Sequence, residues 1–369
     1  MHAQTMERAT GVAVVGAGRW GNHLVRNFLN HPNAQLLAIV DHHRDRLDNL
    51  SQRYSLSAKQ LQLLDPSQWD TLLTRDDLDA VAIATPASTH YSLIESALRH
   101  GKHVFVEKPI TTDPKEAIEL CALAKSLNQQ LIVDHTYLFN PAVDAGREWI
   151  KQRQLGTLRY GYATRTHLGP IRQDVDALWD LAIHDISIFS HWLNEFPCRV
   201  QATGKTWLQP HYGNLTENNQ TEHGNASIDS MLFPRGLSDQ VWVTLAYPSR
   251  IEVSIHLCWA NPDKQRRLCL VGDQGALVFD ELHPSPLNFN PGAIQRNPHG
   301  FTTHPEPPVS IPIEDTEPLY TACDHFLQCV QKNQPSTISS GHLGAKFVEI
   351  LGALTQSLNQ GGTPIFLNT

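Results

Sequence analysis

The first third of the chain alternates short apolar runs with stretches whose apolar residues recur every three or four positions. The runs are rich in β-branched residues and lie at 11–16, 36–41, 81–85, 103–107 and 131–138, and the helical patterns lie at 20–30, 90–100 and 114–128. Short strands that alternate with helices form a parallel sheet with helices on both faces. We therefore predict a doubly wound α/β domain over residues 1–137.

After residue 137 the pattern changes to longer runs in which apolar and polar residues alternate. These runs lie at 158–167, 238–248, 250–260 and 266–272, and the turn sequence YPSR joins two of them. Such a pattern predicts a mostly antiparallel sheet with a few helices. Pro141 can open a helix, so residues 138–369 are expected to form a second, α+β domain.

Two further segments complete the second domain in this interpretation. Residues 281–315 are rich in proline and asparagine, and we expect an ordered loop without regular structure there. Helical patterns follow at 319–333 and 342–360, and Gly361 and Gly362 stop the second of them.

A glycine-rich turn follows the first predicted strand. The sequence GAGRWG places Gly16, Gly18 and Gly21 around Arg19 and Trp20, between that strand and a helix. The first glycine permits a tight turn, the second lets the backbone approach a pyrophosphate, and the third lets the helix pack on the strand. Dinucleotide binding is the functional interpretation, and a glycine turn without a ligand is the structural alternative.

The end of the second predicted strand bears on the choice of dinucleotide. Asp41 closes the run LLAIVD. A carboxylate there accepts hydrogen bonds from the adenosine ribose and repels a 2′-phosphate, which favours NAD over NADP. Arg44, three residues later, tempers this preference because a guanidinium can bind a phosphate.

A lysine follows the strand at 103–107. Lys108 precedes Pro109, which pushes it toward extended geometry at the carboxyl edge of the sheet, where doubly wound folds bind ligands. A solvated surface lysine is the alternative.

A helical run at 178–193, LWDLAIHDISIFSHWL, is apolar around most of its circumference. At 100° per residue, Asp180 and His184 fall within about 60° of each other, in one stripe with Ser187 and His191. A buried helix must give its polar stripe partners or a water-filled cleft. Asp180 and His184 are therefore either a structural core pair or part of a site, and Asp185, which lies off the stripe, has an open role.

Composition and charge narrow the class of protein. The chain has 369 residues, 29 basic and 37 acidic side chains and a net charge of −8, without a basic stripe for nucleic acid. It has no apolar stretch near the roughly 20 residues of a membrane span. Six scattered cysteines and no metal-binding spacing among 20 histidines favour a cytoplasmic protein without a metal site.

These segments together resemble a known family. GAGRWG, ATPASTHY, GKHVFVEKP, HTYLFNPAV and WDLAIHDIS, in this order, are similar to the glucose–fructose oxidoreductase, inositol dehydrogenase and rhizopine-catabolism (Gfo/Idh/MocA) family. The resemblance implies an NAD(P)-binding Rossmann domain and a C-terminal domain whose large open sheet mediates assembly into a homo-oligomer, a dimer or tetramer. It also implies roles for single residues: catalytic Lys108, Asp180 and His184, and cofactor contacts at Thr85, Pro86, His90 and Glu107, beside the glycine loop and Asp41.

Within that family the chain is most similar to enzymes that oxidise the sugar ring of a nucleotide sugar, typically at C3 of a UDP-N-acetylhexosamine. The segments at 135–143, 165–185, 256–281 and 317–330 carry this likeness. Arg165, Arg172 and Lys264 are then candidates to hold phosphate or carboxylate, with ordinary ion pairs as the alternative. His135 and Tyr137 are candidate substrate contacts, and Tyr137 has packing as its alternative.

The resulting hypothesis is hydride transfer between a secondary alcohol of a sugar or nucleotide sugar and the nicotinamide of NAD. His184 would remove the hydroxyl proton, Asp180 would fix the tautomer of His184, and Lys108 would polarise the hydroxyl. Three alternatives stay open: a dehydrogenase of free sugar or inositol, an enzyme that keeps and recycles its NAD in place, and a non-catalytic NAD-binding regulator on the same fold.

Overall fold

The computed structural model describes residues 8–56, 61–210 and 231–368, and the chain divides into two compact units. The first unit comprises Met1–Phe139 and Thr316–Val348, and the second comprises Asn140–Asp315 and Glu349–Thr369. A single cut after residue 137 does not describe this division, because a segment near the C-terminus packs with the first unit. This packing needs contacts between residues about 200 positions apart in the sequence, and local sequence patterns do not encode such contacts.

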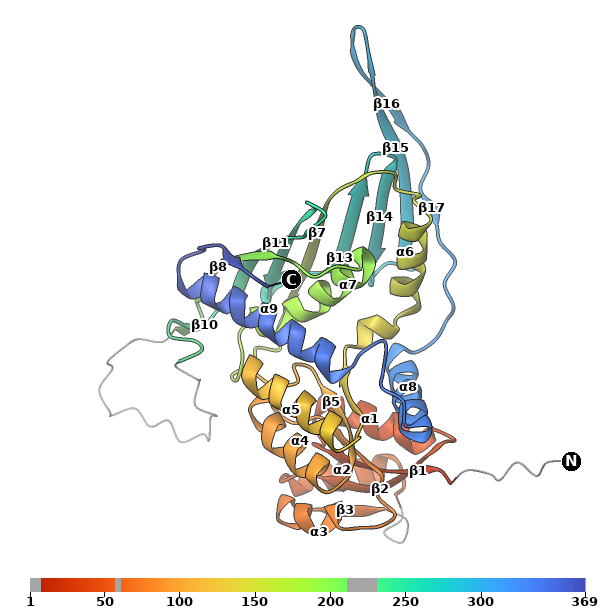
Figure 1. Cartoon of the computed structure of the whole chain (residues 1–369), viewed down its shortest axis with the longest axis vertical. Helices are drawn as coiled ribbons and strands as arrows, with labels where there is room; N and C mark the ends of the chain where they lie inside the picture. The colour runs from red at the N-terminus through yellow and green to blue at the C-terminus, as the bar shows by residue number, and fades with distance from the viewer. Residues whose placement is uncertain (1–7, 57–60, 211–230, 369) are drawn as a thin grey trace, which may run out of the picture. The chain divides into compact units, whose positions relative to one another are not determined.

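The first unit is built on a six-stranded sheet in which each described pair of strands is parallel (Figure 1). Its strand order is β3-β2-β1-β4-β5-β6, which is the doubly wound arrangement expected from the alternating pattern. The strands are β1 (Thr10–Val15), β2 (Ala34–Val40), β3 (Gln62–Leu64), β4 (Ala80–Ile83), β5 (His103–Glu107) and β6 (Leu131–Asp134).

Helices cover this sheet. They are α1 (Arg19–Asn30), α2 (Arg44–Arg53), α3 (Trp69–Leu73), α4 (His90–Arg99), α5 (Pro114–Ser126) and α8 (Pro318–Lys332), with 3₁₀ turns at Pro66–Gln68, Ala87–Thr89 and Thr136–Phe139. α8 packs against α1, β1 and β6, whereas α4 packs against α5, β4 and β5. Phe105 of β5 has its ring centroid 6.4 Å from that of Phe28 in α1 and 5.4 Å from that of Phe326 in α8. α8 therefore completes the core of the first unit.

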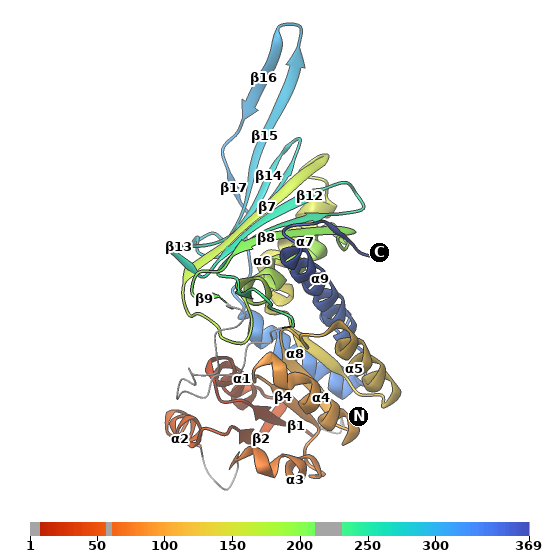
Figure 2. The ribbon, with the colours of Figure 1, turned by 90° about the vertical axis from the view of Figure 1, so that its left-hand side faces the viewer.

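The second unit contains a ten-stranded sheet, which Figure 2 shows from the side. Its main path is β16-β15-β14-β13-β7-β12-β11-β8-β18, with β17 paired to β15, and of the described pairs only β7 with β12 is parallel. The large, mostly antiparallel sheet expected from the sequence is confirmed. The strands are β7 (Leu158–Leu168), β8 (Arg199–Lys205), β11 (Gln240–Ala246), β12 (Glu252–Cys258), β13 (Ala260–Gly272), β14 (Gly275–Asp280), β15 (Leu287–Asn297), β16 (Gly300–Pro305), β17 (Val309–Ser310) and β18 (Ile365–Phe366), and β9 (Gln209–Pro210) pairs separately with β10 (Gly236–Leu237).

Helices of the second unit lie along this sheet. α6 (Pro141–Lys151) begins at Pro141, as the sequence predicts, and Asn140 caps it by accepting a hydrogen bond from the backbone N–H of Ala142. The run at 178–193 forms a π-helical turn, Leu178–Ala182, that continues as α7 (Ile183–Leu193). α9 (Gly341–Asn359) is one helix whose first residues count with the first unit and whose last residues count with the second.

The expectation of an irregular loop at 281–315 is wrong. β15 and β16 form a long hairpin that extends from the sheet, and β17 pairs beside it (Figure 1). Leu287 and Phe289 are buried and alternate with asparagines, which is the period of a half-buried strand. The prolines do not prevent pairing, because strands near a sheet edge tolerate a missing donor.

Two other observations from the sequence concern membrane-spanning helices and the asparagine-rich stretch. No helix within the described parts of the chain is long and apolar enough to cross a membrane. The asparagine-rich stretch at 212–227 lies outside the described residues.

Candidate active site

The glycine turn after β1 leaves room for a ligand at one position only. Gly16 has a φ of +96°, and an added Cβ there would lie 2.5 Å from the Ala84 carbonyl oxygen. A Cβ on Gly21 would lie 1.7 Å from the Gly16 oxygen, so helix and turn are in close contact. A Cβ on Gly18 would meet nothing within 4 Å. Gly16 and Gly21 therefore allow the tight turn and the close helix contact predicted from the sequence, and Gly18 faces open space.

The first turn of α1 begins directly after this open position. Gly18 is its N-cap residue, no side chain caps it, and its first turn contains no acidic residue. Backbone N–H groups at such an end have no intrahelical acceptor and attract negative charge. Arg19 and Trp20 are exposed beside it. These features suit the pyrophosphate of a dinucleotide.

Asp41 lies at the end of β2 with both carboxylate oxygens held by the backbone. Oδ2 accepts a hydrogen bond from the N–H of Ala17 at 2.7 Å, and Oδ1 accepts one from the N–H of His43 at 2.7 Å. The two bonds fix the carboxylate beside the glycine turn and leave lone pairs for ribose hydroxyls. Arg44 instead pairs with Asp48, 3.0 Å away, whereas Arg46 has Nη1 3.7 Å from Asp41. Sequence reasoning weighed Arg44 and missed Arg46.

His90 connects the turns that follow β4 and β5. Its Nδ1 lies 2.8 Å from the Pro109 carbonyl oxygen, and its Nε2 lies 2.9 Å from the Thr85 carbonyl oxygen. The ring is 1% exposed, whereas Thr85 is partly exposed and Pro86 is exposed. Thr85 and Pro86 therefore have surface to offer a cofactor, and His90 holds their turn beside Pro109.

Glu107, Lys108 and Asp134 form a buried charged group where β5 and β6 end. Glu107 and Asp134 are paired residues on these adjacent strands, and their carboxyls are close enough to affect each other's pKa. Burial raises the pKa of Asp134 to about 6 and that of Glu107 well above its ordinary value, and the nearby Lys108 cation opposes both rises. Sequence reasoning found Glu107 and Lys108 but missed Asp134, although the last residue of β6, like that of β5, is acidic in the sequence.

His135 follows Asp134 and is 2% exposed. The Ser339 hydroxyl donates to the Val133 carbonyl oxygen, so His135 must donate from Nδ1 to Ser339 Oγ, 2.7 Å away. This leaves Nε2 as an acceptor without a partner among the described residues. Burial, with a smaller contribution from Lys108, lowers the pKa of His135 to about 3, so the ring is neutral. Tyr137, two residues after His135, is partly exposed.

The second unit exposes few polar side chains along the π-turn and α7. From Leu178 to Ser190, Asp180 and His184 are the two residues that are not buried. Of the helical stripe inferred from the sequence, Ser187 is buried, whereas Asp180, His184 and His191 keep some exposure. Ser187 donates to the His184 carbonyl oxygen, and His191 lies 3.2 Å from Asp144 of α6.

Asp180 belongs to a charged group of its own. Arg172 Nη1 lies 3.3 Å from Asp180 Oδ1, while Nε and Nη2 of Arg172 donate to Asp174 at 2.9 and 2.5 Å. Asp180 also acts to raise the pKa of His167, although burial lowers that pKa overall. Asp176, which is 1% exposed, accepts a bond from the Trp179 N–H, and burial raises its pKa to about 7. The sequence reasoning missed His167 and Asp176.

Arg165 takes the ion-pair alternative that the sequence left open. Its guanidinium donates to Asp185 at 2.7 to 3.2 Å, and the side chains are 3% and 1% exposed. Burial raises the pKa of Asp185, and Arg165 opposes that rise. The partner of Asp185 on α7, which the helical wheel could not identify, is therefore Arg165 on β7.

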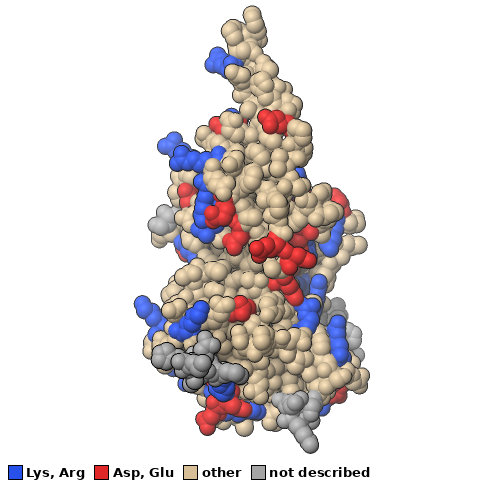
Figure 3. Space-filling model, turned by 90° about the vertical axis from the view of Figure 1, so that its right-hand side faces the viewer, with Lys and Arg blue, Asp and Glu red and all other residues tan. Residues whose placement is uncertain are grey.

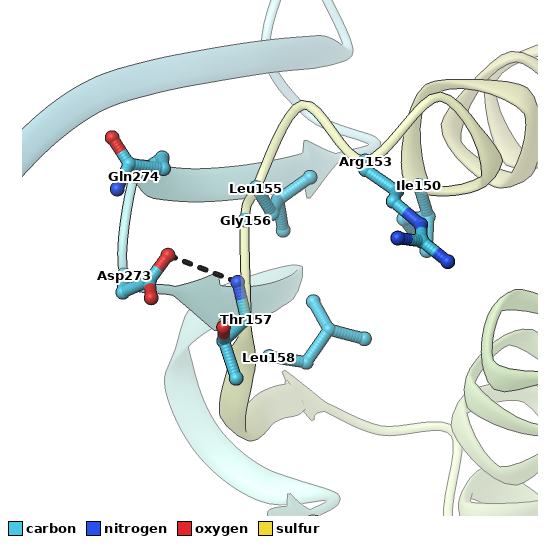
Figure 4. Close-up of a pocket in the computed structure, with 8 residues that line it drawn as sticks. All are labelled: Ile150, Arg153, Leu155, Gly156, Thr157, Leu158, Asp273 and Gln274. Atoms are coloured by element: carbon cyan, nitrogen blue, oxygen red, sulfur yellow. Dashed lines mark hydrogen bonds between the residues drawn. The ribbon is translucent and has the colours of Figure 1, made fainter.

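Other surfaces add no ligand group to this picture. A surface pocket of the second unit is lined by none of the residues predicted from the sequence; in it Asp273 accepts a bond from the Thr157 N–H at 2.9 Å (Figure 4). In the described part of the chain, no three His, Cys, Asp or Glu side chains gather as a metal site would require. On the face drawn in Figure 3, the basic and acidic side chains of the described residues are interspersed.

Comparisons with known proteins agree with the fold. One family model, described as an oxidoreductase family with an NAD-binding Rossmann fold, matches residues 10–135, and the model of the GFO/IDH/MocA C-terminal domain matches residues 143–278. UDP-N-acetylglucosamine 3-dehydrogenase of Acidithiobacillus ferrooxidans is 30% identical over 194 residues, which is 52% of this chain and 56%, about half, of that enzyme.

Two further matches extend over nearly the whole chain. Inositol 2-dehydrogenase of Rhizobium meliloti is 26% identical over 94% of this chain and 96% of its own length. A solved structure of the Acidithiobacillus ferrooxidans UDP-N-acetylglucosamine 3-dehydrogenase superposes with a TM-score of 0.72 over 96% of this chain and 98% of that one. At 20% identity, this structural likeness shows the fold alone.

Proposed function

Because this chain belongs to the GFO/IDH/MocA family of oxidoreductases, we propose that it is an NAD-dependent dehydrogenase acting on a secondary alcohol of a nucleotide sugar. The finer assignment, C3 of a UDP-N-acetylhexosamine, follows the similarity to the UDP-N-acetylglucosamine 3-dehydrogenase of Acidithiobacillus ferrooxidans. Inositol is the competing substrate class, since an inositol 2-dehydrogenase aligns over 94% of this chain.

The glycine turn carries the cofactor part of the proposal. Gly18 faces open space next to an uncapped helix end, and the Asp41 carboxylate is fixed beside the same turn. These groups fit a dinucleotide with a pyrophosphate and a free ribose 2′-hydroxyl. Asp41 favours NAD, because a 2′-phosphate would meet its negative charge.

We propose that Lys108, Asp180 and His184 supply the chemistry. Bound NAD⁺ would accept a hydride at nicotinamide C4 and become NADH. His184 takes the hydroxyl proton as that hydride leaves the carbon, so the alcohol becomes a ketone and the imidazole becomes an imidazolium. Lys108 stabilises the negative charge that develops on the oxygen, and Asp180 orients His184 while Arg172 holds the Asp180 carboxylate.

The substrate part is tested by incubating the purified chain with NAD and, separately, UDP-sugars, free sugars and inositols while NADH absorbance is followed. We expect NADH with a UDP-N-acetylhexosamine. NADH formation with inositol or a free hexose alone would overturn the nucleotide-sugar assignment and leave the reaction class intact.

The catalytic part is tested with Lys108→Ala and His184→Ala. Each should lower kcat by roughly 10²-fold or more while NAD still binds, because each removes a group that acts on the reacting oxygen. Matched controls are Lys125→Ala, at an exposed lysine of α5, and His191→Ala on α7. Near-normal turnover in the two site variants would contradict the proposal.

A further inference from the structure

The end of the first unit's sheet contains two carboxyl groups that face each other. Glu107 and Asp134 are the last residues of β5 and β6 and are paired in parallel register. Paired side chains on adjacent parallel strands point to the same face, about 5 Å apart. Glu107 is 7% exposed and Asp134 is 0% exposed, so solvent does not separate them.

The two carboxyl groups of this pair have one hydrogen-bond donor fewer than their buried oxygens need. Asp134 Oδ1 accepts a bond from the Thr136 hydroxyl at 3.0 Å. Glu107 Oε1 and Asp134 Oδ2 are buried and receive no N–H or O–H donor from the described residues. Two ionised carboxylates in contact would also repel each other. One proton held between the carboxyls supplies a donor and removes the repulsion.

The neighbouring groups fix the charge that the pair must carry. The Lys108 cation acts on both carboxyls. His135 is neutral, because burial holds its pKa far below the ordinary value. Cys323 of α8 also faces the two acids, and burial raises its thiol pKa, so the thiol stays neutral. The Lys108 cation therefore favours one ionised carboxyl in the pair, and burial disfavours a second one.

We propose that Asp134 is a positioning residue: it shares one proton with Glu107, and the pair keeps one negative charge beside Lys108. The functional consequence rests on the proposed role of Lys108. When the pair gains a second proton in acid, the negative charge that helps to hold Lys108 at the strand end is lost. The pair thereby sets the lowest pH at which the site is intact.

The first experiment detects the shared proton without any assay of activity. Infrared spectra of the full chain at about pH 8.5, where ordinary carboxyls are ionised, should show the C=O band of one protonated carboxyl. Asp134→Asn should remove this band, because Glu107 then ionises beside Lys108 without a like charge. Asp176→Asn, which removes a buried carboxyl in the second unit, should leave the band in place.

The second experiment follows the infrared band against pH. In the unaltered chain one protonated carboxyl should persist to about pH 8.5, and in Asp134→Asn the carboxyl of Glu107 should ionise at least about one pH unit below the point at which the pair loses its shared proton, because no second carboxylate then repels it. A purely structural role would lower the melting temperature without moving this titration. If Asp134→Asn does not fold, Glu107→Gln in the infrared experiment should remove the same band.

Two results would overturn the inference: no protonated carboxyl band in the unaltered chain, or an unchanged titration of that band in Asp134→Asn. Neither result depends on whether Lys108 is catalytic. Conversely, normal turnover of Lys108→Ala would refute the proposed function and leave the infrared result standing.

Discussion

Asp41 is held by two backbone N–H groups, from Ala17 and His43. A side chain that is fixed in this way cannot turn aside to admit a phosphate without losing both bonds. We therefore assign the proposed preference for NAD to this carboxylate, and Arg46 lies near enough to attract a phosphate if that charge were removed.

We predict that Asp41→Asn raises the preference for NADP over NAD, measured as the ratio of their KM values, by about tenfold, or ~1.4 kcal/mol. The physical reason is the loss of one negative charge beside the expected 2′-position. Using a ratio within one variant cancels any general loss of stability.

Asp48→Asn is the matched control, because it removes the same charge from an exposed site on α2. An equal change in the ratio for both variants would show that net charge, and not the placement of Asp41, sets the preference.

At the scale of the element, α7 and β7 are joined by a buried ion pair. Arg165 and Asp185 are 3% and 1% exposed, and two nitrogens of the guanidinium contact the carboxylate. A buried pair of this kind adds little stability compared with apolar residues, but removing one partner leaves the other charge uncompensated. The pair therefore fixes how α7 lies on the sheet, and with it the exposure of Asp180 and His184.

Asp185→Asn should lower the free energy of unfolding by about 3–5 kcal/mol, because it removes the buried carboxylate that accepts the hydrogen bonds of the Arg165 guanidinium. Urea unfolding measures the change. Asp144→Asn, which alters an exposed acid on α6, should change stability by less than about 0.5 kcal/mol. A double variant, Arg165→Leu with Asp185→Leu, should lose less than the single variant. Equal losses would show that the cost comes from packing and not from an unpaired charge.

The sequence predicts helices and strands well where apolar residues recur with a regular period, and less well where contacts between distant residues determine the structure. Five of the six strands of the first unit, the hairpin at YPSR and the helix at Pro141 were predictable from local pattern and turn residues, whereas the short β3 was not. The π-turn at 178–182 was not, because a wheel of 100° per residue assumes an α-helix. Proline content hid the Leu-Asn-Phe-Asn alternation in β15. The partner of Asp185 lies 20 residues away on another element, beyond any local pattern.

At the scale of the whole molecule, the first unit is discontinuous in sequence. α8 contributes Leu319, Cys323 and Phe326 to the core that also contains Phe28 and Phe105. Residues 1–139, although they include the whole parallel sheet, therefore lack part of their own core. The two family models stop at residues 135 and 278 and do not include α8.

We predict that a fragment of residues 1–139 does not form a stable NAD-binding domain, because it exposes the apolar surface that α8 covers. Joining residues 316–348 to it through a glycine-serine linker should restore a cooperative thermal transition and NAD binding. Circular dichroism and calorimetry measure both. A cooperative transition and NAD binding by residues 1–139 alone would contradict the prediction.

The same discontinuity has a consequence for the order in which the protein is made. A ribosome releases the parallel sheet early, but α8 emerges only after nearly all of the second unit has been synthesised. During that interval one apolar surface of the sheet stays exposed. In the cell, the N-terminal part of this chain would therefore be the last to finish folding, and chaperones would need to protect it until α8 has been synthesised.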